Sequence, residues 1–180
     1  SGGGADHSAE DAIITRSISG TYENDRITVV GKNAFYACQS LEAVNLGACV
    51  QILDSAFFRC TKLKTVNAPL TSIGNQAFFE SGVVTIESSH ITSIGAACFQ
   101  NTHNLTSISL PRVTTVPNSC LRSCAVQSVD LGAATSIVRT AFTDSAALET
   151  LIIRTETLCT IADASVTLRG SKIAAGTGYI

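Results

Sequence analysis

The sequence contains no tryptophan and no methionine, and only 14% of its residues are charged. Soluble domains average about one quarter charged residues. With a net charge of −2, the chain has no basic excess to hold a phosphate backbone, so we predict no nucleic-acid partner. Serine and threonine are dense throughout, which favours short strands and tight corners over long amphipathic helices. A helix bundle is therefore disfavoured.

Long hydrophobic runs are also missing. No segment approaches the roughly 18 uninterrupted apolar residues of a membrane span, and the first residues lack the basic and apolar regions of a signal peptide. We therefore predict no membrane insertion by this chain. Residues 1–4, Ser-Gly-Gly-Gly, indicate a flexible linker or a cloning remnant, so the missing signal peptide does not identify a compartment.

A spaced signature recurs along the chain: an aliphatic residue, a small residue four positions later, and usually phenylalanine directly after it. The instances are Val30, Ala34, Phe35; Ile52, Ala56, Phe57; Ile73, Ala77, Phe78; Ile94, Cys98, Phe99; Val116, Cys120, Leu121; and Ile137, Ala141, Phe142. Their first members lie 22, 21, 21, 22 and 21 residues apart, by subtraction of those positions. This regularity identifies six sequence repeats.

A second apolar triplet follows each signature, and in the first repeat it is Leu41, Val44 and Leu46. The last two members are two residues apart, so they share one side of a strand and the residue between them faces the other. The predicted inward residues include Leu46, Leu110 and Leu131, and the predicted outward ones Asn45, Ser109 and Asp130. The third and fifth repeats are one residue shorter before this strand, at Gly82 and Ala125, and we expect the corner to absorb the difference without a change of register.

A unit of this length cannot bury its own apolar face, so its stability must come from stacking on neighbouring units. The pattern predicts an α/β repeat solenoid in which each coil has one short parallel strand, a corner, a second extended segment, and an irregular, 3₁₀ or short helical turn at the Ala-Phe pair. The Phe column should fill the coils, with Phe57 and Phe78 buried. We expect a linker at 1–4, an N-terminal capping coil at 5–26, six repeats at 27–154, and a degenerate, truncated C-terminal coil at 155–180.

The unit that runs from Val30 to Leu46, aliphatic-Gly-x-x-Ala-Phe-x-x-Cys-x-x-Leu-x-x-Val-x-Leu, resembles the BspA-like leucine-rich repeats. The resemblance implies a leucine-rich-repeat fold and a surface protein of a bacterium or protist, with similar arrays in gut bacteria and their prophages. It also implies an extracellular, cell-surface or virion-associated location, and adhesion to host or bacterial surface partners. It covers about residues 27–154 and identifies the fold more specifically than the function.

Seven cysteines fall mostly on repeat columns. Cys38, Cys60 and Cys124 lie three residues after the Phe position, and Cys98 and Cys120 occupy the small-residue position, which indicates buried free thiols in place of disulfides. An odd count without a C-x-x-C motif or a neighbouring histidine argues against zinc.

Catalytic motifs are also missing. His7, His90 and His103 fall in the N-terminal lead and in separate turns, and no nucleophile elbow, phosphate loop or dinucleotide fingerprint is present. We predict no catalytic residues, no cofactor, no metal and no enzymatic activity.

The outward strand positions form a polar, weakly charged surface. We predict that a protein or glycan partner contacts it, at Asn45, Thr65, Asn67, Thr85, Glu87, Ser107, Ser109, Ser128 and Asp130. Serine and threonine also suit solvent-facing strands for purely structural reasons. Two functions remain open: a binding module, and a spacer that displays another domain on a cell or phage surface.

Overall fold

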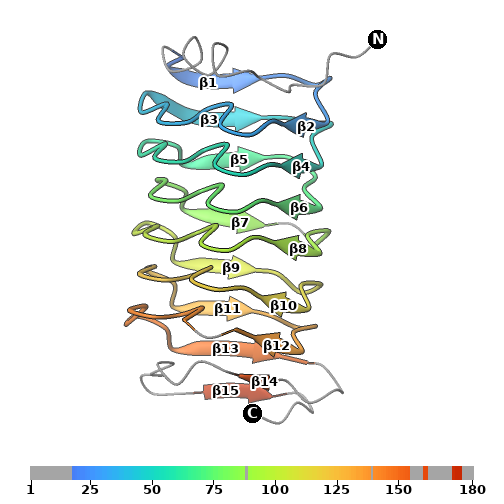
Figure 1. Ribbon diagram of the computed structural model, residues 1–180, viewed down its shortest axis with the longest axis vertical. Coiled ribbons are helices and arrows are strands. Elements are labelled where there is room, and N and C mark those ends of the chain that lie inside the picture. Colours follow the sequence, from blue (N-terminus) through green and yellow to red (C-terminus); the bar gives the residue numbers. More distant parts are fainter. Residues whose placement is uncertain (1–17, 88, 139, 155–159, 162–171, 176–180) are drawn as a thin grey trace.

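The computed structural model describes residues 18–87, 89–138, 140–154, 160–161 and 172–175. Within them the chain winds into a single stack of flat coils, with β1 in the first coil and β14 and β15 in the last (Figure 1). Each repeat contributes one coil, so residues 21 or 22 apart in the sequence lie directly above one another. This is a parallel β-solenoid.

The predicted main strands form one side of the stack. They are β1 (Gly20–Glu23), β3 (Leu41–Asn45), β5 (Thr65–Asn67), β7 (Thr85–Glu87), β9 (Ser107–Ser109), β11 (Ser128–Asp130), β13 (Thr150–Ile153) and β15 (Lys172–Ala175). All pairs within this side are parallel, and equivalent repeat positions pair, as Val44 does with Val66. The pairing follows from the shared period, because a parallel register that matches equivalent positions keeps every aliphatic side chain on the buried face.

The second extended segment of each repeat is also a strand. These strands are β2 (Val29–Val30), β4 (Gln51–Ile52), β6 (Ser72–Ile73), β8 (Ser93–Ile94), β10 (Thr115–Val116), β12 (Ser136–Ile137) and β14 (Thr160–Ile161). They pair in parallel as β2-β4-β6-β8 and β10-β12-β14. Each coil therefore has two short strands, with the apolar residues of both facing its interior.

The turn segment at the Ala-Phe pair contains no helix in the described part of the chain. The α/β class and the helical form of the turn are therefore wrong, and the irregular form that the sequence also allowed is the one observed. The N–H of Phe35 donates to the carbonyl of Ala56 in the next coil at 2.8 Å. The following N–H, of Tyr36, closes a local turn onto the carbonyl of Asn33 at 3.1 Å. An α-helix would use all of these donors within its own segment, so alternate bonding to the next coil excludes it.

The N–H groups of a turn segment bond alternately within the segment and to the next coil. This pattern requires left-handed backbone at two residues of every turn segment, although none of them is glycine. Their φ values lie between 52° and 71°, at Asn33 and Ala37, Ser55 and Arg59, Gln76 and Glu80, Ala97 and Asn101, Ser119 and Ser123, and Thr140 and Asp144. Left-handed backbone costs an L-residue about 1–2 kcal/mol. The hydrogen bonds between coils offset that cost.

The core is a set of columns that run along the stack. The rings of Phe35, Phe57, Phe78 and Phe99 are fully buried and stack with centroids 5.1, 5.4 and 5.6 Å apart and planes within 6° of parallel. The predicted burial of Phe57 and Phe78 is therefore confirmed, and Leu46, Leu110 and Leu131 are buried as well. At the N-terminal end, Tyr22 of β1 packs its ring 5.2 Å from that of Phe35 and closes the column.

The main-strand sheet is interrupted once, at the short third repeat. The strands hydrogen-bond as β1-β3-β5 and as β7-β9-β11-β13-β15, without a ladder between β5 and β7. The predicted register nevertheless holds at this step: the N–H of Val84 donates to the carbonyl of Lys64 at 3.3 Å, as that of Lys64 does to Glu42, and Val83 and Ile86 are buried. The contracted corner moves Gly82 against the previous coil, where its N–H donates to the carbonyl of Cys60 at 3.1 Å. The equally short fifth repeat keeps its pairing, since β11 pairs with both β9 and β13.

Candidate functional site

The nine predicted contact residues all belong to the main strands, where they occupy two columns of equivalent positions. In the first column Thr65, Thr85 and Ser107 are exposed and Ser128 is half-buried. Strand pairing aligns Thr85 with Ser107 and Ser107 with Ser128. The structure therefore brings these hydroxyls into one row along the outer face.

The second column lies two residues further along each strand. Asn67 is exposed, and Asn45, Ser109 and Asp130 are half-buried. The neighbouring leucines, Leu46, Leu110 and Leu131, are fully buried, so the predicted outward and inward positions are confirmed. Glu87 is placed in β7 by its backbone, paired with Ser109, and its side chain lies outside the described part. The break between β5 and β7 divides both columns into two groups.

Hydrogen bonds between coils explain the partial burial of Asn45 and Asp130. The Asn67 amide donates to Asn45 Oδ1 at 2.7 Å, and the Asn45 amide donates to Glu23 Oε1 at 3.1 Å. At the other end, Arg154 Nη1 donates to Asp130 at 2.7 Å and partly covers it. Three of the predicted contact residues, Asn45, Asn67 and Asp130, are therefore already held in place by side chains of neighbouring coils.

The second-segment face is different, because its threonines bond to the backbone. The hydroxyl of Thr71 donates to the carbonyl of Val50 at 3.1 Å, and those of Thr92 and Thr135 donate to the carbonyls of the preceding coil at 3.3 Å. These side chains join consecutive coils. Their structural role explains why threonine recurs there.

The described cysteines are buried and stand as free thiols, and Cys159 lies outside the described residues. The predicted shielding of Cys38 and Cys60 is confirmed. Cys98 Sγ and Cys120 Sγ lie 3.3 Å apart, a hydrogen-bonding distance. Burial raises the pKa of Cys98 well above its ordinary value and that of Cys124 to about 12, so both thiols are protonated at neutral pH.

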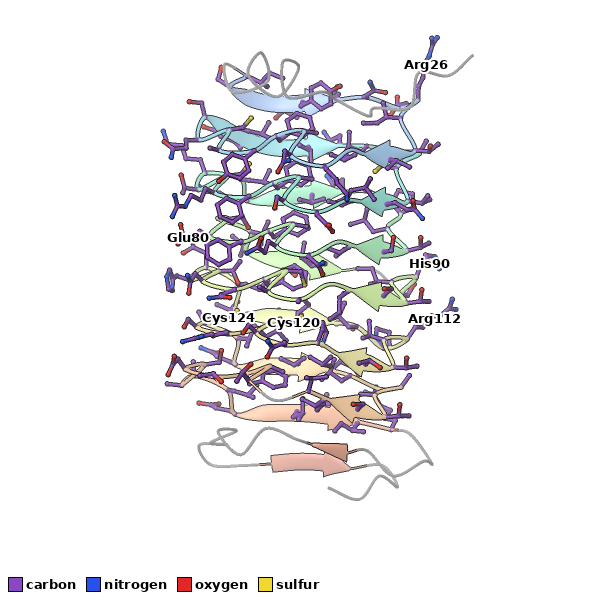
Figure 2. The ribbon with its side chains drawn as sticks, viewed as in Figure 1. Arg26, Glu80, His90, Arg112, Cys120 and Cys124 are labelled. Carbon is purple, nitrogen blue, oxygen red and sulfur yellow. The ribbon has the colours of Figure 1, made fainter. Side chains whose placement is uncertain are left out.

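The described histidines lie outside the strand columns and the buried cysteine columns. His90 and His103 are exposed, and His7 lies outside the described residues. Figure 2 shows His90 and Arg112 on one edge of the stack and Glu80 on the opposite edge. In the part of the chain that the structure describes, no group of three His, Cys, Asp or Glu side chains could hold a metal ion, and no helix is long and apolar enough to cross a membrane.

The comparison with protein families agrees with this geometry. The profile of the BspA type leucine rich repeat region matches residues 28–149 in six copies, more than half of the chain. The chain belongs to the BspA-type leucine-rich repeat family. Among curated proteins, none matches it.

One solved structure supports the leucine-rich repeat fold. A leucine-rich repeat protein of T. pallidum aligns with a TM-score of 0.54 and 23% identity, over 73% of this chain and 57% of that one. The BspA-type chain thus spans little more than half of that protein. A leucine-rich repeat protein from Bacteroides ovatus aligns at 17% identity and a TM-score of 0.46, over 77% of this chain and 56% of that one. A leucine rich cell surface protein from Faecalibacterium prausnitzii aligns at 15% identity and a TM-score of 0.29, over 76% of this chain and 73% of that one.

One feature of the BspA-type repeats was missed by the sequence analysis: an outer aromatic ladder. Tyr36, Phe58 and Phe79 are half-buried on the turn segments, and their rings stack at 4.8 and 4.7 Å with planes within 5° of parallel. The guanidinium of Arg59 lies 5.5 Å from the Phe58 ring centre. The residue directly after the inner Phe is aromatic in the first three repeats, and this pattern would have revealed the ladder. Since the ring faces cover one another, mainly ring edges reach the surface.

Proposed function

We propose that this BspA-type chain is a non-enzymatic binding module that presents the outer face of its main strands to a protein or glycan partner at a cell surface. The family suggests an interaction or structural role. The observation that carries the proposal is the parallel pairing of equivalent positions, as between Ser107 and Ser128 and between Ser109 and Asp130. This pairing aligns the outward hydroxyl and carboxylate groups in fixed rows.

Fixed rows favour binding because a partner does not have to order them. The strands hold the backbone, and the bonds from Asn67 to Asn45 and from Asn45 to Glu23 hold the side chains. Pre-organisation of this kind lowers the entropic cost of association. The weak charge of the rows predicts binding that depends little on salt, in contrast to a partner held by many Lys and Arg side chains.

The spacer function is the second candidate. Interfaces derive most of their binding energy from a few Trp, Tyr and Arg side chains. The two proposed contact columns contain none of these, and Arg154 at the end of the face is already paired with Asp130. A face without such anchors suits a chain that only holds another domain away from a surface, or one that binds weakly at many copies.

A double substitution, Asn67→Arg with Ser109→Arg, tests the binding module. Labelled wild-type chain is applied to an array of immobilised bacterial and mammalian glycans and extracellular proteins. We expect the wild type to bind at least one class, and the double variant to lose at least about tenfold in affinity because bulk and charge disrupt the rows. The melting temperature should change little, since surface substitutions alter stability by about 0.5 kcal/mol or less.

The matched control places two arginines on the second-segment face, Ser93→Arg with Thr115→Arg, where both native residues are exposed. This control should bind as the wild type does. Equal loss in both double variants would assign the effect to charge alone. Absence of any wild-type binding on the array would favour the spacer.

A further inference from the structure

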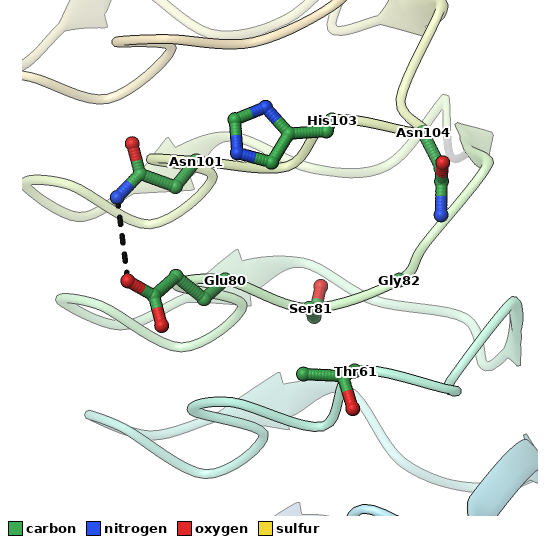
Figure 3. A pocket seen from close by; sticks show the side chains of 7 residues that line it. All are labelled: Thr61, Glu80, Ser81, Gly82, Asn101, His103 and Asn104. Carbon is green, nitrogen blue, oxygen red and sulfur yellow. Dashed lines mark hydrogen bonds between the residues drawn. The ribbon is translucent and has the colours of Figure 1, made fainter.

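A hollow of about 290 Å³ opens between the corners of the third and fourth repeats, on the edge of the stack where the turn segments lead into the main strands (Figure 3). Its walls include Glu80, Ser81 and Gly82 of the third repeat and Asn101, His103 and Asn104 of the fourth. These residues do not belong to the proposed strand face. The hollow therefore requires its own explanation.

The short third repeat explains why the hollow is there. In each repeat a short corner joins the residue three positions after the inner Phe to the first aliphatic residue of the strand triplet. This corner is Thr61 and Lys62 in the second repeat and His103 and Asn104 in the fourth, but Gly82 alone in the third. A Cβ on Gly82 would lie 2.3 Å from the carbonyl oxygen of Thr61, so this corner is drawn tightly against the second repeat. The longer corner of the fourth repeat then stands away from it and leaves the space.

Ser81 gives an independent sign of a ligand. Other members of its column bond to a backbone carbonyl: Cys60 to that of Phe35 at 2.9 Å, and Cys124 to that of Phe99 at 2.8 Å. Ser81 is only 4% exposed, and its hydroxyl is the one buried side-chain oxygen or nitrogen among the described residues without a partner. Figure 3 shows this oxygen pointing toward the fourth repeat, on the side of the hollow. A buried hydroxyl without a partner is unfavourable, and a polar ligand would satisfy it.

The opposite wall is polar as well. Asn104 extends from the fourth repeat toward Gly82, and Asn101 faces Glu80, to whose Oε1 its amide donates at 3.5 Å (Figure 3). The second oxygen of the Glu80 carboxylate accepts a bond from Arg59 Nε at 2.7 Å. The hollow thus combines hydrogen-bond donors and acceptors with a carboxylate whose charge is already compensated.

We propose that this hollow binds one ring of a neutral sugar. Each sugar hydroxyl both donates and accepts, which matches the amides of Asn101 and Asn104, the Glu80 carboxylate and the Ser81 hydroxyl. A cation is a poor fit, because the only carboxylate in the lining is already paired with Arg59. The volume lies at the small end of ligand sites, so a single ring is the matching size.

Titration with methyl glycosides tests the site. Methyl glucoside, galactoside and mannoside and N-acetylglucosamine are each added to the ¹⁵N-labelled chain, and amide chemical shifts are followed by NMR. At least one sugar should shift the amides of Ser81, Gly82 and Asn104 in a saturable manner. Ser81→Ala should weaken that binding about three- to tenfold, as expected for one lost hydrogen bond.

A second variant fills the hollow without touching the core. Asn104 is exposed, and Asn104→Phe should abolish the sugar-dependent shifts. Its matched control is Ala147→Phe at the equivalent exposed position of the sixth repeat, which should bind as the wild type does. The strand-face variant Asn67→Arg with Ser109→Arg should also retain sugar binding, so this site and the proposed function can fail separately.

Three results would overturn the proposal: no shift with any of the sugars, shifts that survive both Ser81→Ala and Asn104→Phe, or shifts at the same amides with calcium chloride alone. Circular dichroism of each variant establishes that it is folded. If Asn104→Phe does not fold, Asn104→Ala replaces it and should weaken binding about three- to tenfold.

Discussion

The inner aromatic column shows how one residue position holds several coils together. Phe57 stacks on Phe35 on one side and on Phe78 on the other, and all three rings are fully buried. Phe58, the next residue, stacks in the same way but is only half-buried. The two positions therefore separate the contribution of burial from that of stacking.

Phe57→Ala should lower the free energy of unfolding by about 3–5 kcal/mol, because it removes buried surface and leaves a cavity between two rings. Phe58→Ala should cost clearly less, since part of its surface is already in water. Urea denaturation of both variants measures the two differences. Equal costs would mean that stacking, not burial, dominates in both columns.

The turn segments show the limit of sequence analysis at the scale of the element. The Ala-Phe signature located these segments correctly and predicted the burial of the phenylalanines. It did not predict left-handed backbone at positions such as Ala37 and Arg59, which are ordinary helix-forming residues. Their conformation is decided by N–H donation to the next coil, and a single repeat read alone contains no information about that partner.

The interrupted ladder between β5 and β7 predicts a difference in hydrogen exchange. β9 is hydrogen-bonded to strands on both sides, whereas β7 pairs only with β9. The amides of Thr85–Glu87 should therefore exchange at least about tenfold faster than those of Ser107–Ser109, since local opening breaks fewer bonds. Exchange measured residue by residue by NMR checks this. Equal protection of the two strands would show that β5 and β7 form a hydrogen-bonded ladder in solution.

At the scale of the whole molecule, the buried thiols link stability to alkaline pH. Burial raises the pKa of Cys124 from its ordinary value of 9.0 to about 12, and the pKa values of Cys49, Cys60 and Cys98 are also raised mainly by burial. Above pH 9 the unfolded chain releases these protons and the folded chain keeps them. Stability is therefore full below the ordinary pKa and is lost as the pH rises toward the folded value.

Replacing Cys124 by serine should reduce this loss. Serine fits the column, where Ser145 and Thr102 already occur, and it does not titrate. Between about pH 9 and 12 the wild type should lose about 1.4 kcal/mol more per pH unit than Cys124→Ser. Urea midpoints at several pH values measure both slopes. Parallel slopes would show that Cys124 ionises in the folded state.

The candidate sites also differ in how far the sequence could define them. The two columns of the strand face follow from the period of two and the repeat spacing, as the positions of Thr65 and Ser107 show. The reduced exposure of Asn45 and Asp130 depends on side chains from neighbouring coils. The only sign of the hollow in the sequence is that the third repeat has one residue fewer, at Gly82, than its neighbours.

The sequence by itself determined the solenoid, its six repeats and the inward columns, because these follow from a period repeated often enough to exclude chance. The tertiary structure decided the conformation of the turns, the break after β5 and the side on which the hollow opens. The physical reason is the same in each case. Each feature depends on how the backbone N–H donors and the corner residues of one coil contact the next coil. That contact exists only once the coils are stacked.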